Sequence, residues 1–273
     1  MTIPVIRGRQ LDAWDGEYKE FQSYDSGKAD ADAGAIGGAA DEPWINVIHA
    51  YEPSAFPAVE RLLADPALVA KIRGTVIDVG AGTCFLSAKL SRLSAVDKVY
   101  PIDLSEKFLT TTGARILQHF GAATEKVTFV ASDFNDIPLA PASADAAFVF
   151  SSIHHSLSPI KTLQEVGRVV KPGGTVFILE NPKSVIGIRK ARQEMFGLSA
   201  QNTEIAYTRA ELEYLILNAN IGRCDVLRWD VLSRPGPRRW LRTAIRALGL
   251  EDILLNPPNY LFVITRHPQG GRP

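Results

Sequence analysis

The sequence has little cysteine, no net charge and no long apolar run, and each absence argues against a class of protein. Its 273 residues hold only two cysteines, far apart at Cys84 and Cys224. This spacing fits neither a metal site nor a disulfide framework and favours a reducing cytoplasm. Thirty basic residues balance thirty acidic ones, so we expect no nucleic-acid partner, because neutralising phosphates needs a basic excess. No run of about 18 apolar residues occurs, so we expect no transmembrane segment.

From Gly74 onward, short apolar runs typical of strands alternate with amphipathic runs typical of helices. The expected strands are 75–79, 98–103, 126–132, 144–152 and 175–180, with helices expected at 84–93, 105–120 and 159–174. Continuously apolar strands that alternate with helices indicate a parallel sheet covered on both faces. Two further strand-like runs, 223–229 and 260–265, bring the number to seven. The sequence therefore predicts an α/β fold, a Rossmann-like, doubly wound and mostly parallel sheet of seven strands.

The residues before this alternation differ in composition and predict a separate extension. We expect residues 1–72 to form an N-terminal helical extension with a mobile loop at about 25–42, where Ala, Gly and Asp dominate. Residues 73–273 then form the main domain. An insert at about 181–207, after the fifth strand, is expected to cover the substrate side.

The run "VIDVGAGTCFLS", residues 76–87, carries two glycines directly after the first apolar strand. Glycines there allow a ligand to approach the backbone closely at the carboxyl end of a parallel sheet. A dinucleotide-binding loop places a third glycine where this chain has Phe85. No Lys followed by Ser or Thr comes after the loop, which excludes a phosphate-binding P-loop. The ligand is therefore expected to lack a bound phosphate chain.

Acidic residues near the strand ends indicate what that ligand contains. Asp103 ends the second strand and is placed to accept hydrogen bonds from ribose hydroxyls. Asp133 ends the third strand, where it suits an exocyclic amine, and Phe134 suits a base. Asp78 beside the glycines suits an ammonium group. The combination describes an adenosine joined to an amino acid, as in S-adenosylmethionine, although Asp78 as a helix cap and Asp103 and Asp133 as turn residues stay open alternatives.

Five ordered pieces of the chain together resemble a known family. They are "VIDVGAGTCFLS", "YPIDLSEKFL", "ASDFNDIPL", "ADAAFVFSSIHHSL" and "LQEVGRVVKPGGTVFILE", all within residues 74–181. In order and spacing they resemble class I S-adenosylmethionine-dependent methyltransferases of the small-molecule type. The resemblance implies that the last two strands form an antiparallel hairpin. It also implies a cofactor-binding set of Asp78, Gly80, Ala81, Gly82, Asp103, Leu104, Asp133, Phe134 and Ser151, with S-adenosylhomocysteine as the product.

The implied reaction is methyl transfer to an oxygen, nitrogen or carbon atom of a small-molecule metabolite by in-line displacement. His154 and His155 follow the fourth strand and are the candidates for a base that removes the acceptor's proton. Ordering of the loop is the competing role for this pair. Glu180 at the end of the fifth strand is a candidate substrate contact. An aromatic lid over the sulfonium is expected from Tyr18, Phe21, Tyr24 and Trp44, which equally suit anchoring of an N-terminal helix.

Other functions stay open beside this one. A non-catalytic protein that binds S-adenosylmethionine as a sensor or partner subunit predicts binding without turnover. A nicotinamide-dependent oxidoreductase is disfavoured by Phe85, and a protein or RNA methyltransferase by the lack of Asn-Pro-Pro-Tyr after the fourth strand. Residues 237–248 place arginines beside leucine and isoleucine at helical spacing, a pattern that suits peripheral contact with an anionic membrane. An ordinary surface helix is the favoured interpretation of that run.

Overall fold

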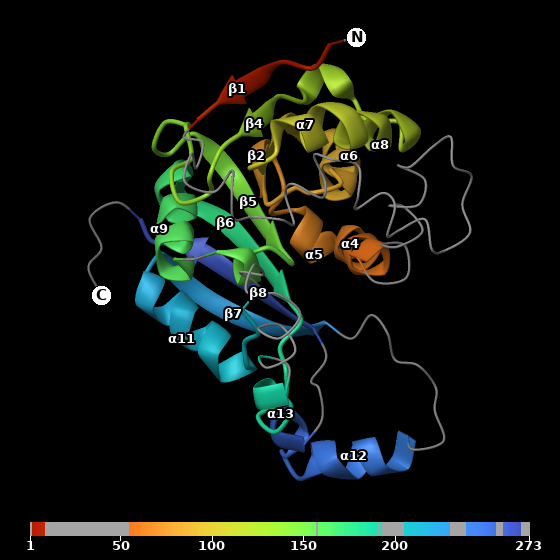
Figure 1. The fold of residues 1–273 in the computed structure, drawn as a ribbon, viewed down its shortest axis with the longest axis vertical. Helices are drawn as coiled ribbons and strands as arrows, with labels where there is room; N and C mark the ends of the chain where they lie inside the picture. The colour runs from red at the N-terminus through yellow and green to blue at the C-terminus, as the bar shows by residue number, and fades with distance from the viewer. Residues whose placement is uncertain are drawn as a thin grey trace.

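The computed structural model describes residues 2–8, 55–156, 158–190, 192, 205–229, 239–254 and 259–268. In these ranges the chain forms one eight-stranded sheet in the order β1-β4-β3-β2-β5-β6-β8-β7 (Figure 1). The strands are β1 (Val5–Arg7), β2 (Gly74–Val79), β3 (Val96–Asp103), β4 (Phe129–Ala131), β5 (Ala144–Phe150), β6 (Val170–Glu180), β7 (Gly222–Trp229) and β8 (Asn259–Arg266). Neighbours from β1 to β6 are parallel, and β8 is antiparallel to both β6 and β7.

The predicted mostly parallel α/β sheet with a terminal antiparallel pair is therefore confirmed, but the predicted number of strands is wrong. Val5–Arg7 adds an eighth strand by pairing in parallel with Phe129–Ala131. A three-residue run is too short to show an alternating pattern, so no strand signal is visible there. The start of the expected helical extension thus belongs to the sheet.

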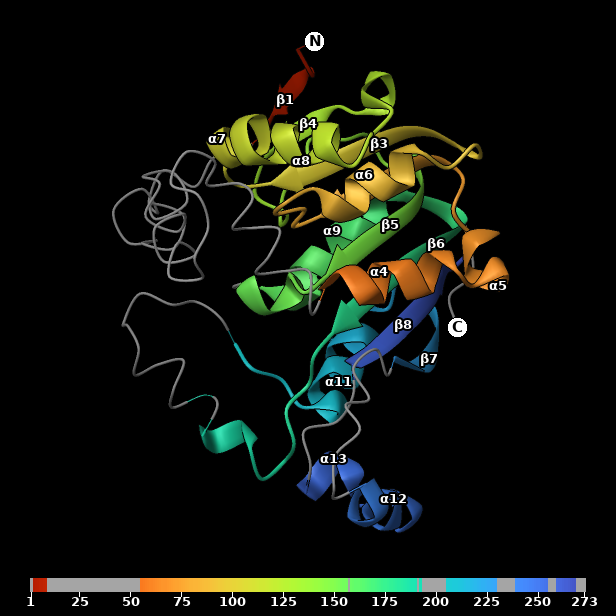
Figure 2. The same cartoon turned by 90° about the vertical axis from the view of Figure 1, so that its right-hand side faces the viewer.

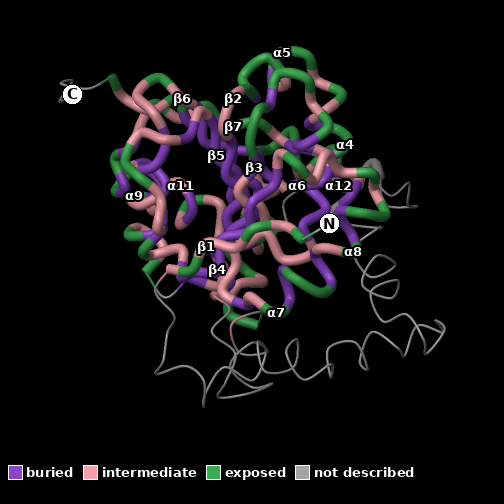
Figure 3. The backbone as a smooth tube through the Cα atoms, turned by 90° about the horizontal axis from the view of Figure 1, so that it is seen from above, coloured by how far each residue is buried: buried purple, intermediate pink, exposed green. Residues whose placement is uncertain are grey.

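Helices cover both faces of the sheet, as Figures 1 and 2 show. One face carries α4 (Ala55–Leu63), α5 (Pro66–Val69), α6 (Phe85–Ser91), α7 (Glu106–Phe108) and α8 (Ala114–His119); the other carries α9 (Pro159–Val169) and α11 (Arg209–Ala219). Each face has its own apolar core, and the buried strands lie between the two cores (Figure 3). This is the doubly wound arrangement, which leaves the carboxyl ends of the parallel strands for a site.

Local signals set the helix ends. Ser105 accepts a hydrogen bond from the Phe108 amide at 3.1 Å, and Thr208 and Glu211 form the reciprocal capping box that their spacing predicts. The expected helix at 105–120 forms, although Leu109–Gly113 is π-helical. The helix expected over 159–174 ends earlier, at Val169, because Val170 already pairs with Ala144 at the start of β6.

Several predictions lie outside the described residues. These are the N-terminal helix and loop at 25–42, the lid candidates Tyr18, Phe21, Tyr24 and Trp44, and the middle of the 181–207 insert. Among the helices in the described ranges, none has both the length and the apolar character needed to cross a membrane.

Candidate functional site

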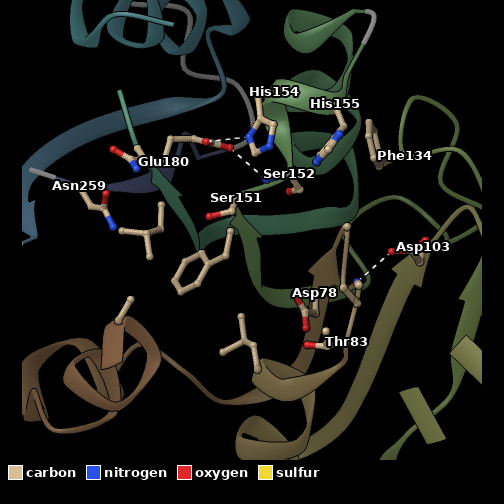
Figure 4. Close-up of a pocket in the computed structure, with 18 of the residues that line it drawn as sticks. Asp78, Thr83, Asp103, Phe134, Ser151, Ser152, His154, His155, Glu180 and Asn259 are labelled. Atoms are coloured by element: carbon tan, nitrogen blue, oxygen red, sulfur yellow. Dashed lines mark hydrogen bonds and ion pairs between the residues drawn. The ribbon is translucent and has the colours of Figure 1, made fainter. Parts of the chain in front are cut away.

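A cavity of about 490 Å³ lies at the carboxyl ends of β2, β3, β5 and β6 (Figure 4). Its volume is in the range of small-molecule sites. Most of the predicted site residues line it: Asp78, Gly80, Ala81, Gly82, Asp103, Leu104, Phe134, Ser151, His154, His155 and Glu180. Residues far apart in the sequence thus meet at one edge of the sheet. In Figure 4, Asp78 and Asp103 lie across the cavity from His154 and Glu180.

The glycine loop forms the floor of this cavity, and its backbone geometry excludes side chains. Gly80 has a φ of +71°, and a Cβ there would lie 2.4 Å from the Ser152 Cβ atom. The amides of Gly80 and Ala81 both donate to the Ile102 carbonyl oxygen at 2.9 Å, which ties the loop to the end of β3. Gly82 is also left-handed, with a φ of +47°. A ligand can therefore approach this backbone closely.

Asp103 holds the loop and also lines the cavity. Its Oδ2 accepts from the Gly82 amide at 2.9 Å and its Oδ1 from the Ser105 amide at 3.1 Å. A carboxylate offers about four lone-pair positions to donors. This carboxylate also lines the cavity. The geometry suits a pair of neighbouring hydroxyl groups.

Asp78 is a buried carboxyl group, with only 3% of its surface exposed. Ser87, in α6, donates its hydroxyl to Asp78 Oδ2 at 2.6 Å. Burial raises the pKa of Asp78 to about 6, against the lowering effect of the Ser87 hydrogen bonds. This contact joins Asp78 to α6, the helix that it was alternatively expected to cap, and the same residue lines the cavity.

Asp133 is not among the residues that line the cavity, although its neighbour Phe134 is. The buried Asp133 carboxylate accepts from the backbone amide of Asn135 at 2.9 Å and from its side-chain amide at 3.0 Å. These bonds are those of a turn former, the alternative that the sequence left open. Its predicted contact with an exocyclic amine stays a prediction.

Ser151 turns the chain from β5 into the loop that carries the two histidines. It has a left-handed φ of +47°, which is uncommon for a residue with a side chain, and its amide donates to the Leu179 carbonyl at 2.8 Å. Such strained positions gather at functional sites. The turn brings the following residues over the cavity.

Glu180 organises the histidine loop through both of its carboxylate oxygens. Oε1 accepts from the amides of Ser152 and Ile153, each at 3.0 Å, and Oε2 lies 3.0 Å from Nδ1 of His154 (Figure 4). A carboxylate next to Nδ1 holds the proton on that nitrogen and leaves a lone pair on Nε2. His154 and Glu180 therefore form a pair, with the side chain of Glu180 only 6% exposed.

His155 differs from His154 in its surroundings. Burial, together with the neighbouring His154, lowers the pKa of His155 to about 3. Such a group stays neutral near pH 7 and is a weak proton acceptor there. Of the two candidate bases, His155 is therefore the poorer proton acceptor.

The sequence analysis missed the pairing of Glu180 with His154, although a signal for it exists. Strands β5 and β6 are neighbours, with Phe150 paired to Leu179. Ser152, two residues after β5, and Glu180, the last residue of β6, must therefore lie close together. Knowing that these two strands are neighbours would have indicated this contact, but the sequence alone does not show which strands are adjacent.

Further residues that the sequence analysis did not assign to the site also line the cavity. They are mostly aromatic or polar and include Phe56, Ser152, Asn181, Lys183, Tyr207 and Asn259. Phe56 of α4 stacks on Phe85, with ring centroids 3.6 Å apart, and Phe85 also meets Phe120 edge-on. The residue at the third-glycine position is thus part of an aromatic cluster. The described ends of the 181–207 insert line the cavity at Asn181, Lys183 and Tyr207.

Comparisons with known proteins agree with this geometry. The family model described as "Methyltransferase domain" matches residues 77–178. The demethylmenaquinone methyltransferase of Clavibacter sepedonicus is 34% identical over 119 residues, which is 43% of this chain and 46% of that protein. The first curated relatives align over less than half of their own length.

Solved structures share the fold at lower identity. The [4+2]-cyclase SpnF matches 98% of this chain and 99% of its own, with a TM-score of 0.60 and 18% identity. The phosphoethanolamine N-methyltransferase 2 of Haemonchus contortus, solved with S-adenosyl-L-methionine, matches 77% of this chain and 53% of its own, with a TM-score of 0.53 and 17% identity. At these identities the likeness shows the fold alone.

Proposed function

Because residues 77–178 form a methyltransferase domain of the class I, S-adenosylmethionine-dependent type, we propose that this chain transfers a methyl group to an oxygen, nitrogen or carbon atom of a small molecule. The observation that carries the proposal is that one cavity brings together the glycine loop, Asp103 and the His154–Glu180 pair. The proposed cofactor site and the candidate base thus lie in the same cavity of about 490 Å³.

The residues of the cavity fit the cofactor. Gly82 leaves open space for it, Asp103 at the cavity wall suits the two ribose hydroxyls, and buried Asp78 suits the ammonium group. Phe134 lines the cavity and suits packing against the adenine ring. When bound, S-adenosylmethionine supplies a methyl group on a positively charged sulfur, already activated for displacement. The chain itself then contributes proximity, alignment and exclusion of water.

His154 is the residue that we propose as the base. Glu180 holds Nδ1, so Nε2 presents its lone pair and can take a proton from the nucleophilic atom of the acceptor. The buried carboxylate stabilises the imidazolium that results, because opposite charges attract strongly away from water. Ser152 and Ile153 keep Glu180 in place by donating their amides to its other oxygen.

Calorimetric titration with S-adenosylhomocysteine tests the cofactor assignment, with NADH titrated in parallel. We expect micromolar binding of S-adenosylhomocysteine and none of NADH. Binding of NADH, or of neither compound, would overturn the proposal. A screen with radiolabelled S-adenosylmethionine then presents phenols, amines and carbon acids as acceptors. Binding without label transfer to any of these classes would favour the non-catalytic alternative, a sensor or partner subunit.

The raised pKa of Asp78 predicts how cofactor affinity depends on pH. Above a pKa of about 6 the carboxyl group is ionised and can pair with an ammonium group; below it, the neutral acid cannot. Affinity for S-adenosylhomocysteine should therefore fall about tenfold from pH 7 to pH 5. The Asp78→Asn variant should bind weakly and with little pH dependence over this range, while calorimetry of the wild type at each pH gives the reference. A flat wild-type profile would remove Asp78 from the ammonium site.

A further inference from the structure

Helices α12 (Arg239–Ala247) and α13 (Glu251–Leu254) project from the end of the molecule opposite β1, in both side views (Figures 1 and 2). They are tied to the segment after β6 by two backbone hydrogen bonds. The Val185 amide donates to the Asp252 carbonyl at 2.9 Å, and the Ile186 amide to the Ile253 carbonyl at 3.2 Å. We call residues 239–254, together with Val185 and Ile186, the α12–α13 platform.

The platform exposes large apolar side chains to an unusual degree. Of the nine such side chains that are exposed in the described part of the chain, five lie here: Val185 (54%), Ile186 (65%), Leu248 (71%), Ile253 (41%) and Leu254 (44%). They come from two segments about sixty residues apart in the sequence that meet in space. Single exposed apolar residues are ordinary, but a group of this kind marks an interaction surface.

The charge of the platform is one-sided. The acidic residues of α13 are paired within the protein: Glu251 with Arg228 at 2.6 Å and with Arg246 at 3.1 Å, and Asp252 with Arg209 at 3.3 Å. Exposed basic residues outnumber these acids: Arg246 belongs to α12, and Arg189 and Lys190 follow Ile186 closely in the sequence. The apolar group therefore lies in a cationic surround.

We propose that the α12–α13 platform docks on the surface of an anionic lipid bilayer. At such a surface, exposed apolar side chains lie at the headgroup–acyl boundary and neighbouring cations lie near phosphates. Interfaces with other proteins are instead enriched in Tyr, Trp and Phe, whereas the five exposed apolar side chains of the platform are all aliphatic. These aliphatic side chains beside basic residues thus favour a membrane over a protein partner.

Docking in this way has a consequence for the cavity. Lys183 lines the cavity and lies two residues before Val185, at the start of the platform. A bilayer beneath the platform therefore borders the cavity on the side of Asn181 and Lys183. The site would then draw its acceptor from, or next to, the lipid surface. The docking itself does not depend on methyl transfer, so it is measured without a cofactor.

Vesicle flotation of the full chain tests the inference. We expect the protein to float with vesicles that contain phosphatidylglycerol in phosphatidylcholine, to bind less to phosphatidylcholine alone, and to be released by high salt. The double variant Leu248→Asp, Ile253→Asp should lose at least about fivefold of the bound fraction, because charges at the boundary oppose insertion. The matched control is Leu217→Asp on α11, where Leu217 is 76% exposed; its binding should equal that of the wild type.

Three results would overturn the proposal: no flotation with anionic vesicles, equal flotation of the double variant and the wild type, or an equal loss in the Leu217→Asp control. Light scattering of the wild type and the double variant, after gel filtration, examines the alternative occupant. A self-associated wild type that the double variant converts to a monomer would assign the platform to a second copy of the chain. Circular dichroism checks that both variants are folded.

Discussion

Replacing His154 with alanine is expected to lower the turnover number by about 10²–10⁴-fold, the usual contribution of a positioned general base. The side chain removed is the one that Glu180 orients from 3.0 Å, with Nε2 left to accept a proton. Affinity for S-adenosylhomocysteine should change little, because the glycine loop and Asp103 form the opposite wall (Figure 4). Steady-state kinetics with the best acceptor from the screen and calorimetry with the product give the two numbers.

The Glu180→Gln variant shows whether the pair acts through the tautomer of His154. Glutamine keeps an oxygen for the amides of Ser152 and Ile153, so its NH₂ group then faces His154 Nδ1 and donates to it. The ring proton is forced to Nε2, and the lone pair that takes the acceptor's proton is lost. We expect turnover to fall as far as in His154→Ala. Nitrogen-15 NMR of the ring should report the changed tautomer, which a merely structural role of Glu180 would leave as it is.

The control for both variants is His119→Gln, which alters an exposed histidine of α8 that packs edge-on against Phe120. It should keep wild-type kinetics. A loss of less than about tenfold in His154→Ala, with an acceptor that carries a removable proton, would contradict the base role. The histidine would then serve to order the loop, the alternative that the sequence analysis left open.

Much of the sheet could be predicted because its signals are local. The apolar runs at Val76–Val79 and Val176–Leu179 are buried strands that a reader of the sequence finds by composition alone. Ser105, Thr208 and Glu211 set helix starts through contacts within three residues. The strand Val5–Arg7 has no such signal. It exists because the edge of β4 offers it a partner, and that edge is known only once the sheet is assembled.

The candidate site likewise contains residues that local signals predict and residues that they do not. The glycine loop and Asp103 follow directly from strands that the sequence marks, so the structure finds them where they were expected. Asp133 also follows a predicted strand. Its carboxylate, however, accepts a hydrogen bond from the nearby Asn135 amide, and this local contact competes with contacts to a ligand. The pairing of Glu180 with His154 was not predicted, for the opposite reason. Its partners lie on the loop after a neighbouring strand, and strand adjacency is a long-range property.

The Asp103→Ala variant should weaken binding of S-adenosylhomocysteine by about 10²–10⁴-fold. Two hydrogen bonds from ribose hydroxyls to a charged carboxylate are lost, each worth about 1.5–3 kcal/mol, and about 1.4 kcal/mol corresponds to tenfold in affinity. The variant also leaves the amides of Gly82 and Ser105 without their acceptor, which loosens the loop on which the cofactor lies. Calorimetry at pH 7.5 measures the loss, well above the titration of Asp78.

The Asp103→Asn variant separates the two contributions to that loss. Asparagine keeps one carbonyl oxygen for the Gly82 amide but loses the charge and one acceptor position for the diol. If Asp103 binds the ribose, this variant should fall between wild type and Asp103→Ala. If Asp103 only braces the loop, then asparagine should restore nearly full affinity, and the ribose contact would have to be sought elsewhere in the cavity. A third explanation is a general loss of stability, and thermal unfolding of both variants tests it. The predicted losses of affinity should persist at temperatures well below the unfolding midpoint of either variant.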